Sequence, residues 1–349
     1  MRKLLLSLAC LCGLLCTAHL SAQRAYKVSV AFYNLENLFD TEDNENNDED
    51  FLPGGANAWT EERYMQKLSN MATVISQLAG GKAPDVLGLC ELENRRVLED
   101  LTAHPAIANL GYRIVHFDSP DRRGIDVALL YRPGVFKLVD ANTHTVKIPG
   151  EPHIKTRDVL EVNGTILGES FHFMVAHWPS RAGGEQISLK RRMAAAEVMR
   201  RVVDSLQIAD PTGKAILMGD LNDDPISPSL TEGLRSKNDE KGLSGDWDLF
   251  NVMAKLHRSG YGTLAYRDVW NLFDNLIVTN NLIQENSKGL RVQLDKATGA
   301  YGRIFNAPFL TQSTGHYKGY PLRTMSNGQF QNGYSDHYPV YLYLVKEAK

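Results

Sequence analysis

The segment Ala-Ile-Leu-Met-Gly-Asp-Leu-Asn-Asp at residues 215–223 changes abruptly from apolar to polar. Its apolar half predicts a short buried strand over residues 215–218, and its polar half places Asp220 and Asn222 on the loop that follows. Short loops at strand ends often carry catalytic side chains, because the rigid sheet positions them. A single carboxylate in such a place commonly only begins a turn, so the rest of the chain must decide its meaning.

Five further strand ends carry side chains of the same kind. Predicted strands cover residues 26–34, 86–90, 171–176, 276–279 and 340–344. The polar residues beside them are Asn34 with Glu36, Glu91, His177, Asp274, and Asp336 with His337. Together they offer hard oxygen ligands for Mg²⁺, Mn²⁺ or Ca²⁺, and two histidines for proton transfer or charge stabilisation. The sequence has no cysteine pair or His-x-x-x-His spacing beside them, which argues against a closed zinc site.

The remaining predicted elements surround these strands. Thr60 is placed to cap a helix that ends at Gly80-Gly81, and a second helix covers residues 187–206. Further strands are predicted over residues 112–117, 127–131 and 165–167. Strands outnumber helices, which favours sheets covered by helices. No internal repeat or linker interrupts the pattern, so residues 23–349 are expected to form a single domain.

In their order and spacing, these polar elements resemble the endonuclease/exonuclease/phosphatase superfamily, which has the DNase I-like fold. The resemblance runs from Asn34 to His337, and its most specific parts are Gly219-Asp220-Leu221-Asn222 and Ser335-Asp336-His337. It implies an α/β fold, a four-layer sandwich of two packed β-sheets flanked by helices. It also implies a phosphoesterase that depends on a divalent cation, with Mg²⁺ expected and Mn²⁺ or Ca²⁺ as alternatives.

The resemblance implies a role for each polar residue. Glu91 is expected to be the main metal ligand, with Asn34, Asp336 and Glu36 as further groups at the metal. Asp220 and Asn222 are expected to hold the attacking water and the phosphate. His337 is expected beside the phosphate, oriented by Asp274, because a carboxylate fixes the tautomer of an imidazole and favours its charged form. His177 is expected to be the second histidine of the DNase-like branch.

Two positions depart from the family pattern. Cys90 stands where many relatives carry a glutamine before the metal-binding glutamate. Leu272-Phe273 stands before Asp274 where many relatives carry Arg-Ile, so an arginine that faces the phosphate is missing there. The sequence does not choose among three possible replacements, which are Arg181, Arg267 and Arg303.

Three further features each allow two interpretations. Asp126, which opens the predicted strand 127–131, either orients His177 or only begins a turn. Trp178 either stacks on a base or sugar of the substrate or packs against its own loop. The helix over residues 187–206 carries basic residues that form either a solvated face or a contact to phosphates. These basic residues are Lys190, Arg191, Arg192, Arg200 and Arg201.

Residues 1–22 have the composition of a signal peptide. Arg2 and Lys3 precede an apolar run over residues 4–15, which is too short for a permanent membrane span, and Ser21-Ala22 offer a cleavage site before Gln23. An uncleaved anchor is the alternative. Three of the four cysteines lie in this segment, and Leu15 before Cys16 does not suit a lipoprotein. Cys90 alone cannot form an internal disulfide, so we expect an exported protein, periplasmic or extracellular, without one.

The charge of the chain bears on its substrate. The formal net charge is −3, and removal of Arg2 and Lys3 changes it to −5. This mildly acidic balance argues against nucleic-acid binding by bulk charge, but a local basic patch is compatible with it. We therefore expect a phosphodiesterase, with nucleic acid favoured as its substrate. The alternatives are a phosphomonoesterase, a lipid-, inositol-phosphate- or sphingomyelin-hydrolysing enzyme, and a binding protein of the same fold. No protein partner and no later membrane span are expected.

Overall fold

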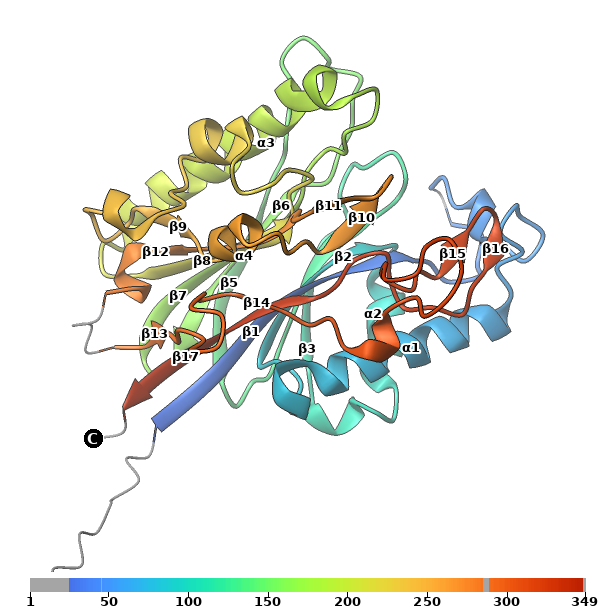
Figure 1. The fold of residues 1–349 in the computed structure, drawn as a ribbon, viewed down its shortest axis with the longest axis horizontal. Helices are drawn as coiled ribbons and strands as arrows, with labels where there is room; N and C mark the ends of the chain where they lie inside the picture. Colours follow the sequence, from blue (N-terminus) through green and yellow to red (C-terminus); the bar gives the residue numbers. More distant parts are fainter. Residues whose placement is uncertain (1–24, 45, 285–288, 348–349) are drawn as a thin grey trace, which may run out of the picture.

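Two β-sheets lie face to face at the centre of the molecule (Figure 1). The structure is a computed structural model, and it describes residues 25–44, 46–284 and 289–347. The expected signal peptide, residues 1–22, lies outside the described residues.

The first sheet contains the two ends of the described chain. Its strand order is β13-β17-β1-β2-β4-β3, and β14 also pairs with β17. The central strand β1 runs antiparallel to β17 and parallel to β2. The strands are β1 (Ala25–Leu38), β2 (Val86–Leu92), β3 (Arg113–His116), β4 (Asp126–Tyr131), β13 (Arg291–Val292), β14 (Arg303–Ile304) and β17 (Val340–Glu347).

The second sheet has the order β5-β6-β7-β8-β12-β9. Only the pairing of β7 with β8 is parallel within it, and α3 connects these two strands. The strands are β5 (Phe136–His144), β6 (Val159–Ile166), β7 (Glu169–His177), β8 (Lys214–Asp220), β9 (Leu249–Asn251) and β12 (Asp274–Thr279).

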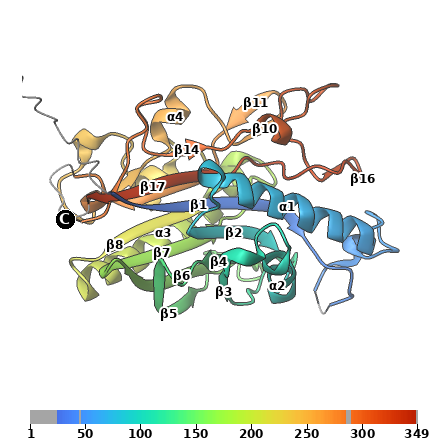
Figure 2. The same cartoon turned by 90° about the horizontal axis from the view of Figure 1, so that it is seen from below.

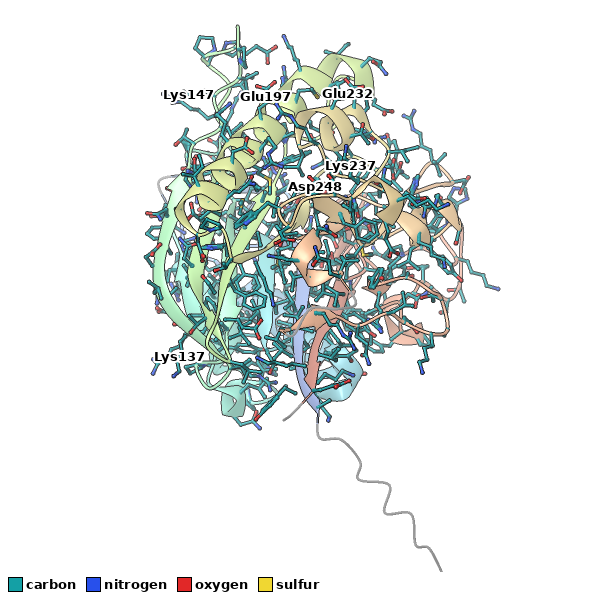
Figure 3. The ribbon with its side chains drawn as sticks, turned by 90° about the vertical axis from the view of Figure 1, so that its left-hand side faces the viewer. Lys137, Lys147, Glu197, Glu232, Lys237 and Asp248 are labelled. Atoms are coloured by element: carbon teal, nitrogen blue, oxygen red, sulfur yellow. The ribbon has the colours of Figure 1, made fainter. Side chains whose placement is uncertain are left out.

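Helices cover the outer faces of both sheets. Helices α1 (Glu61–Gly81) and α2 (Arg95–Ala103) pack on the first sheet, and α3 (Glu185–Ala209) packs on the second. Figure 1 shows the resulting layers, and Figure 2 shows α1 lying across the first sheet. The outward side of α3 carries exposed charges such as Glu197 (Figure 3). This arrangement confirms the expected four-layer sandwich.

Three smaller elements lie outside the two sheets. They are the short helix α4 (Ala254–Arg258) and two hairpins, β10 (Leu264–Tyr266) with β11 (Val269–Asn271), and β15 (Met325–Ser326) with β16 (Gln329–Phe330). None of the helices in the described ranges has the length and apolar character that crossing a membrane requires.

The sequence predicted the long elements better than the short or polar ones. Thr60 caps α1 by accepting a hydrogen bond from the backbone N–H of Arg63, as expected. Helix α2 was not expected, because it has only nine residues and few of them are apolar. Strand β5 was not expected either, because it lies at the sheet edge with most of its side chains exposed, so it lacks an apolar alternation.

Candidate active site

The side chains at the candidate site continue the rows that line the core between the sheets. In β8, Ile216 and Met218 face this core, so Asp220, two residues further along, faces the same way. The rows of β1, β7 and β12 continue in the same manner into Asn34, His177 and Asp274. All four side chains are nearly inaccessible to solvent. The period of the strands therefore brings residues from both sheets to one end of the core.

Asp220 is the centre of this group. The side-chain Nδ2 of Asn34 in the first sheet donates to Asp220 Oδ2 over 3.1 Å, which joins the two sheets. The backbone N–H of Asn222 donates to Asp220 Oδ1 over 3.0 Å. The Nε2 atoms of His177 and His337 lie 3.6 and 3.7 Å from Asp220 Oδ2. Two imidazoles thus flank one carboxylate.

His337 is oriented by Asp274, which confirms the expected pair. Its Nδ1 donates to Asp274 Oδ2 over 2.7 Å, and the Asp274 strand pairs with the Asp220 strand so that the two aspartates are opposite each other. Burial lowers the pKa of His337, but the carboxylates of Asp274 and Asp220 outweigh it and hold that pKa well above its ordinary value. His337 therefore carries a positive charge where an anionic substrate would lie.

His177 has the opposite protonation state. Burial lowers the pKa of His177 well below its ordinary value, and the cations Arg157 and Arg123 lower it further. Arg157 is itself buried, and it donates to the backbone oxygens of His177 and Trp178 while pairing with Asp121 over 2.8 Å. The site thus holds one charged and one neutral imidazole, a combination suited to acid and base roles.

A β-bulge aims Glu91 into the site. The register of β2 shifts between Cys90 and Leu92, and Glu91, which lies between them, has a φ of 58°. Its Oε1 lies 3.8 Å from His177 Nε2, and its Oε2 accepts from the backbone N–H of Asn37 over 3.2 Å. Bulges next to active sites commonly redirect one side chain in this way. The strand therefore does not end before Glu91, as the sequence suggested, but bends there.

Cys90 is a buried side chain without a reactive role. It is buried in the core between the sheets, and burial raises the pKa of its thiol well above its ordinary value, with Asp220 and Glu91 raising it further. The side chain at this departure from the family pattern is thus an uncharged packing group.

Glu36 is engaged by donors of the protein, and its expected role at the metal stays a prediction. Its Oε2 accepts from the backbone N–H of Thr324 over 2.7 Å, and its Oε1 accepts from Arg323 and from the backbone N–H of Met325. Burial raises the pKa of Glu36 to about 7, and the charge of Asp336 raises it too. Because protein donors occupy both carboxylate oxygens, Glu36 anchors the segment before the last strand.

Asp336 lies at the solvent side of the same group. Its Oδ2 accepts from Arg323 over 2.6 Å, and about a third of its side chain is exposed. Beneath it, the ammonium of Lys67 on α1 donates to the hydroxyl of Thr324 and the carbonyl oxygen of Tyr334. Burial lowers the pKa of Lys67 to about 8, against the charges of Glu36, Asp336 and Glu91. Asp336 thus shares a patch of negative charge with Glu91.

The ring of Trp178 is covered and so is not placed to stack on a substrate, whereas the expected catalytic role of Asn222 stays a prediction. The Trp178 ring is only 1% exposed, packs under α3, and its Nε1 donates to the sulfur of Met199 over 3.2 Å. The side chain of Asn222, whose φ is 51°, donates to the carbonyl oxygen of Trp178 over 2.9 Å. Asn222 therefore fixes the turn after Asp220 and presents its backbone N–H to that carboxylate.

Asp126 orients a different histidine from the one expected. Its Oδ2 lies 2.9 Å from His116 Nε2, and its Oδ1 accepts from the backbone N–H and the hydroxyl of Ser119. The pairing of Asp126 with His177 is therefore wrong. Possible ligand atoms of His116, Asp118 and Asp126 lie within 4.8 Å of one another. Within this second polar group, Asp126 is buried and Asp118 is exposed.

None of the three arginines suggested by the sequence replaces the missing one. Arg181 is held by Asp223 and Asp224 at 3.0 and 3.3 Å, with its guanidinium over the ring of Phe273. Arg303 lies over Tyr343 in the first sheet. Arg267 lies over the ring of Tyr266 in the β10–β11 turn.

The basic residues of α3 are mostly paired within the protein. Lys190 and Arg191 both contact Glu151, at 2.6 and 2.7 Å, and Arg192 is buried against Asp223 at 2.7 Å. Arg200 is likewise paired with Asp204 on the same helix. These pairs favour a structural role over a phosphate contact.

Among known protein families, the model of the Endonuclease/Exonuclease/phosphatase family matches residues 29–346 of the chain. The chain belongs to this family. Among curated protein sequences, none matches the chain significantly.

Solved structures of other family members have the same fold. TDP2 from D. rerio, in a complex with a single-strand DNA product, is 15% identical with a TM-score of 0.54, over 91% of this chain and 98% of that one. The mannosyl-6-phosphatase Bt3783 from Bacteroides thetaiotaomicron is 18% identical with a TM-score of 0.53, over 91% and 99%. The human Nocturnin catalytic domain is 16% identical with a TM-score of 0.53, over 92% and 95%. At such identities the likeness shows the fold alone.

The donor set fits a divalent cation, as is typical of this family. Burial raises the pKa of Asp220 to about 7 and His337 lowers it, while the negative charges of Asp274 and Glu91 raise it. This excess of negative charge, from oxygen ligands, is what a hard cation would compensate. Glu91 and Asp336, which are more exposed than Glu36, are the carboxylates best placed to hold it, with Asn34 as a further group.

Two arginines at the rim were missed by sequence reasoning. Arg123 NH2 lies 3.6 Å from Glu91 Oε2, and Arg323 contacts Asp336, and each side chain is about half exposed. Arg123 lies only three residues before Asp126, and the sequence analysis considered Asp126 in this segment rather than Arg123. Arg323 gave no local signal, because it reaches the site only through the hairpin that precedes the last strand. Both guanidinium groups thus lie at the rim beside carboxylates of the candidate site.

Proposed function

We propose that this protein is a divalent-metal-dependent phosphodiester hydrolase, with nucleic acid as the favoured substrate. The observation that carries the proposal is the pair of imidazoles on Asp220, at 3.6 and 3.7 Å, with opposite protonation states. Hydrolysis of a P–O bond needs an activated water on one side and stabilisation of the phosphate charge on the other. Asp220, with the neutral His177 beside it, can activate the water, and the charged His337 can stabilise the phosphate charge.

The residues of the candidate site have different roles in this hydrolysis. Asp220, fixed by Asn34 and Asn222, is placed to orient the attacking water and accept its proton. His337, held by Asp274, stabilises negative charge on the phosphate, as do the rim arginines Arg123 and Arg323. A bound Mg²⁺, or Mn²⁺ or Ca²⁺, held by Glu91 and Asp336, would neutralise phosphate charge and polarise the phosphorus centre.

Purified protein is expected to cleave bis-p-nitrophenyl phosphate faster than p-nitrophenyl phosphate in the presence of Mg²⁺ or Mn²⁺. The second histidine, His177, favours a diester. A panel with plasmid DNA, RNA, inositol phosphates and sphingomyelin extends the test, and the Asp220→Asn variant controls for contaminating hydrolases. A strong preference for the monoester, with nucleic acids intact, would instead support a phosphatase that uses the same residues. Absence of cleavage of every phosphoester with each metal would refute the hydrolase and leave a binding protein.

We also propose that the protein is exported and begins near Gln23. Support comes from Arg2 and Lys3, the short apolar run and Ser21-Ala22. Intact-mass measurement of the protein outside the cytoplasm should give the mass of residues 23–349. A mass that includes residues 1–22, or a lipid on Cys16, would contradict this proposal.

A further inference from the structure

A cavity of about 530 Å³ lies beside the candidate active site. Its walls are the β10–β11 hairpin and the segment over residues 312–331, which includes the β15–β16 hairpin. Figures 1 and 2 show both hairpins at the same end of the molecule. The volume is in the range of ordinary small-molecule sites. We call this cavity the hairpin pocket.

The hairpin pocket adjoins the candidate active site through Arg323. Arg323 lines it and also bonds Asp336 and Glu36. Asp336, which Arg323 contacts over 2.6 Å, directly precedes His337 in the sequence. A group attached to a phosphate at His337 could therefore enter the pocket without leaving the active site.

The free surface of the hairpin pocket is aromatic and cationic. Tyr266 and Tyr317 line it and are 62% and 46% exposed, and His316 lines it beside Tyr317. The one carboxylate in the lining, Asp268, accepts a hydrogen bond from the hydroxyl of Tyr320 over 2.6 Å. Exposed rings beside arginines suit a planar π system attached to a phosphate.

The turn of the β10–β11 hairpin supports a role for its side chains. Arg267 and Asp268 have φ values of 49° and 63°, a conformation that favours glycine or asparagine. The other hairpin turn uses Asn327-Gly328 for the same conformation, without this cost. Arg267 thus keeps a long cationic side chain at a strained position, with its guanidinium 5.2 Å from the ring centre of Tyr266 at the pocket.

We propose that the hairpin pocket binds an unpaired nucleobase next to the scissile phosphate, by stacking on Tyr266 and Tyr317. This inference rests on the proposed phosphodiester hydrolysis and adds to it the part of the substrate that sets specificity. The base is recognised by its π face, so its attachment to a mononucleotide or to a single strand makes no difference to the contact.

Two esters with the same leaving group test the inference. Thymidine 5′-(p-nitrophenyl phosphate) carries a base, and methyl p-nitrophenyl phosphate does not. We expect kcat/KM to favour the thymidine ester by about tenfold or more, since stacking of a base on an aromatic side chain is typically worth about that much. The double change Tyr266→Ala and Tyr317→Ala should remove this preference, mainly through KM, and leave kcat on the methyl ester unchanged.

Matched variants separate stacking from folding. Replacement of both tyrosines by phenylalanine keeps the rings and should keep the preference, whereas Tyr26→Ala, at a tyrosine 51% exposed on β1, should change nothing. If the wild type cleaves both esters equally well and the alanine variant changes neither, the base pocket is refuted while the hydrolase stands. If neither ester is cleaved with any metal, the proposed hydrolase fails, and a binding measurement decides the pocket.

The binding measurement uses the Asp220→Asn protein with Mg²⁺ and fluorescence polarisation. The probes are a labelled octathymidylate and an abasic octamer of the same length and charge. Tighter binding of the base-bearing strand, lost with the alanine variant, supports the inference, and equal binding refutes it. Competition by thymidine monophosphate shows whether a single nucleotide is enough.

Discussion

Replacement of His337 by alanine should lower kcat for phosphodiester cleavage by about 10²- to 10⁴-fold, the size of a lost acid–base or electrostatic contribution. His337 is the charged imidazole of the site, and it lies 3.7 Å from Asp220. The fold should persist, because the side chain lies at the end of the core. Steady-state kinetics and circular dichroism measure the two effects. A loss below about tenfold would show that His337 is not part of the reaction.

The Asp274→Asn variant tests the source of that charge. Asp274 is the strongest of the groups that raise the pKa of His337, so its neutral replacement should lower this pKa. Activity that needs the imidazolium is present below the pKa of His337 and is lost as the pH rises through it, so the decline should move to lower pH. NMR titration of the histidines measures the shift directly. An unchanged His337 titration would contradict the pairing.

A second histidine–carboxylate pair provides the control for both variants. His144 Nε2 lies 2.6 Å from Glu161 Oε2 in the β5–β6 pair, on the edge of the second sheet and away from Asp220. The variant His144→Ala breaks a comparable contact and should leave kcat and its pH dependence unchanged.

Removal of divalent cations with EDTA should abolish turnover, and Mg²⁺ or Mn²⁺ should restore it. Glu91→Gln should weaken metal binding at least about tenfold, the loss that even indirect changes at metal sites produce. Titration calorimetry measures the affinity, and the rise in Tm on adding Mg²⁺ gives a readout that is independent of activity.

Glu36 is the matched control for Glu91. Its carboxylate oxygens already accept from Arg323, Thr324 and Met325, so Glu36→Gln should lower the free energy of unfolding without changing the metal affinity. If instead Glu36→Gln weakens metal binding as much as Glu91→Gln does, then Glu36 is a ligand after all.

Thiol-blocking reagents should have no effect on the activity of the protein, because the one cysteine among the described residues is buried.

The sequence could predict the part of the site that follows from strand period. Asn34, His177, Asp220 and Asp274 lie at the ends of predicted strands, and this shared placement indicated that they meet. The aspartate partner of His337 was also foreseeable, because the family pattern carries it. The positions of these residues follow from regular strands, whose geometry can be predicted from the sequence.

The rest depended on irregular backbone and on distant packing. Glu91 and Glu36 both lie at bulges with positive φ, yet one faces His177 and the other the 323–325 segment, and no local pattern separates them. Trp178 was ambiguous because only the position of α3 decides that its ring is covered. Arg323 reaches the site across 287 residues of sequence separation from Glu36, which no local spacing can reveal.

The pairing of β1 with β17 has a consequence for how the molecule acquires its activity. Ala25 lies opposite Glu347, so the first and last described strands are neighbours in the middle of one sheet, and the site takes residues from Asn34 to His337. Contacts between such distant parts of a chain form slowly, because a long loop must close before they contribute any stabilisation. Until β17 docks, the helices and most of the second sheet can be folded, but His337 is not yet in place at the site. We therefore expect the candidate site to be complete only after β17 has docked beside β1.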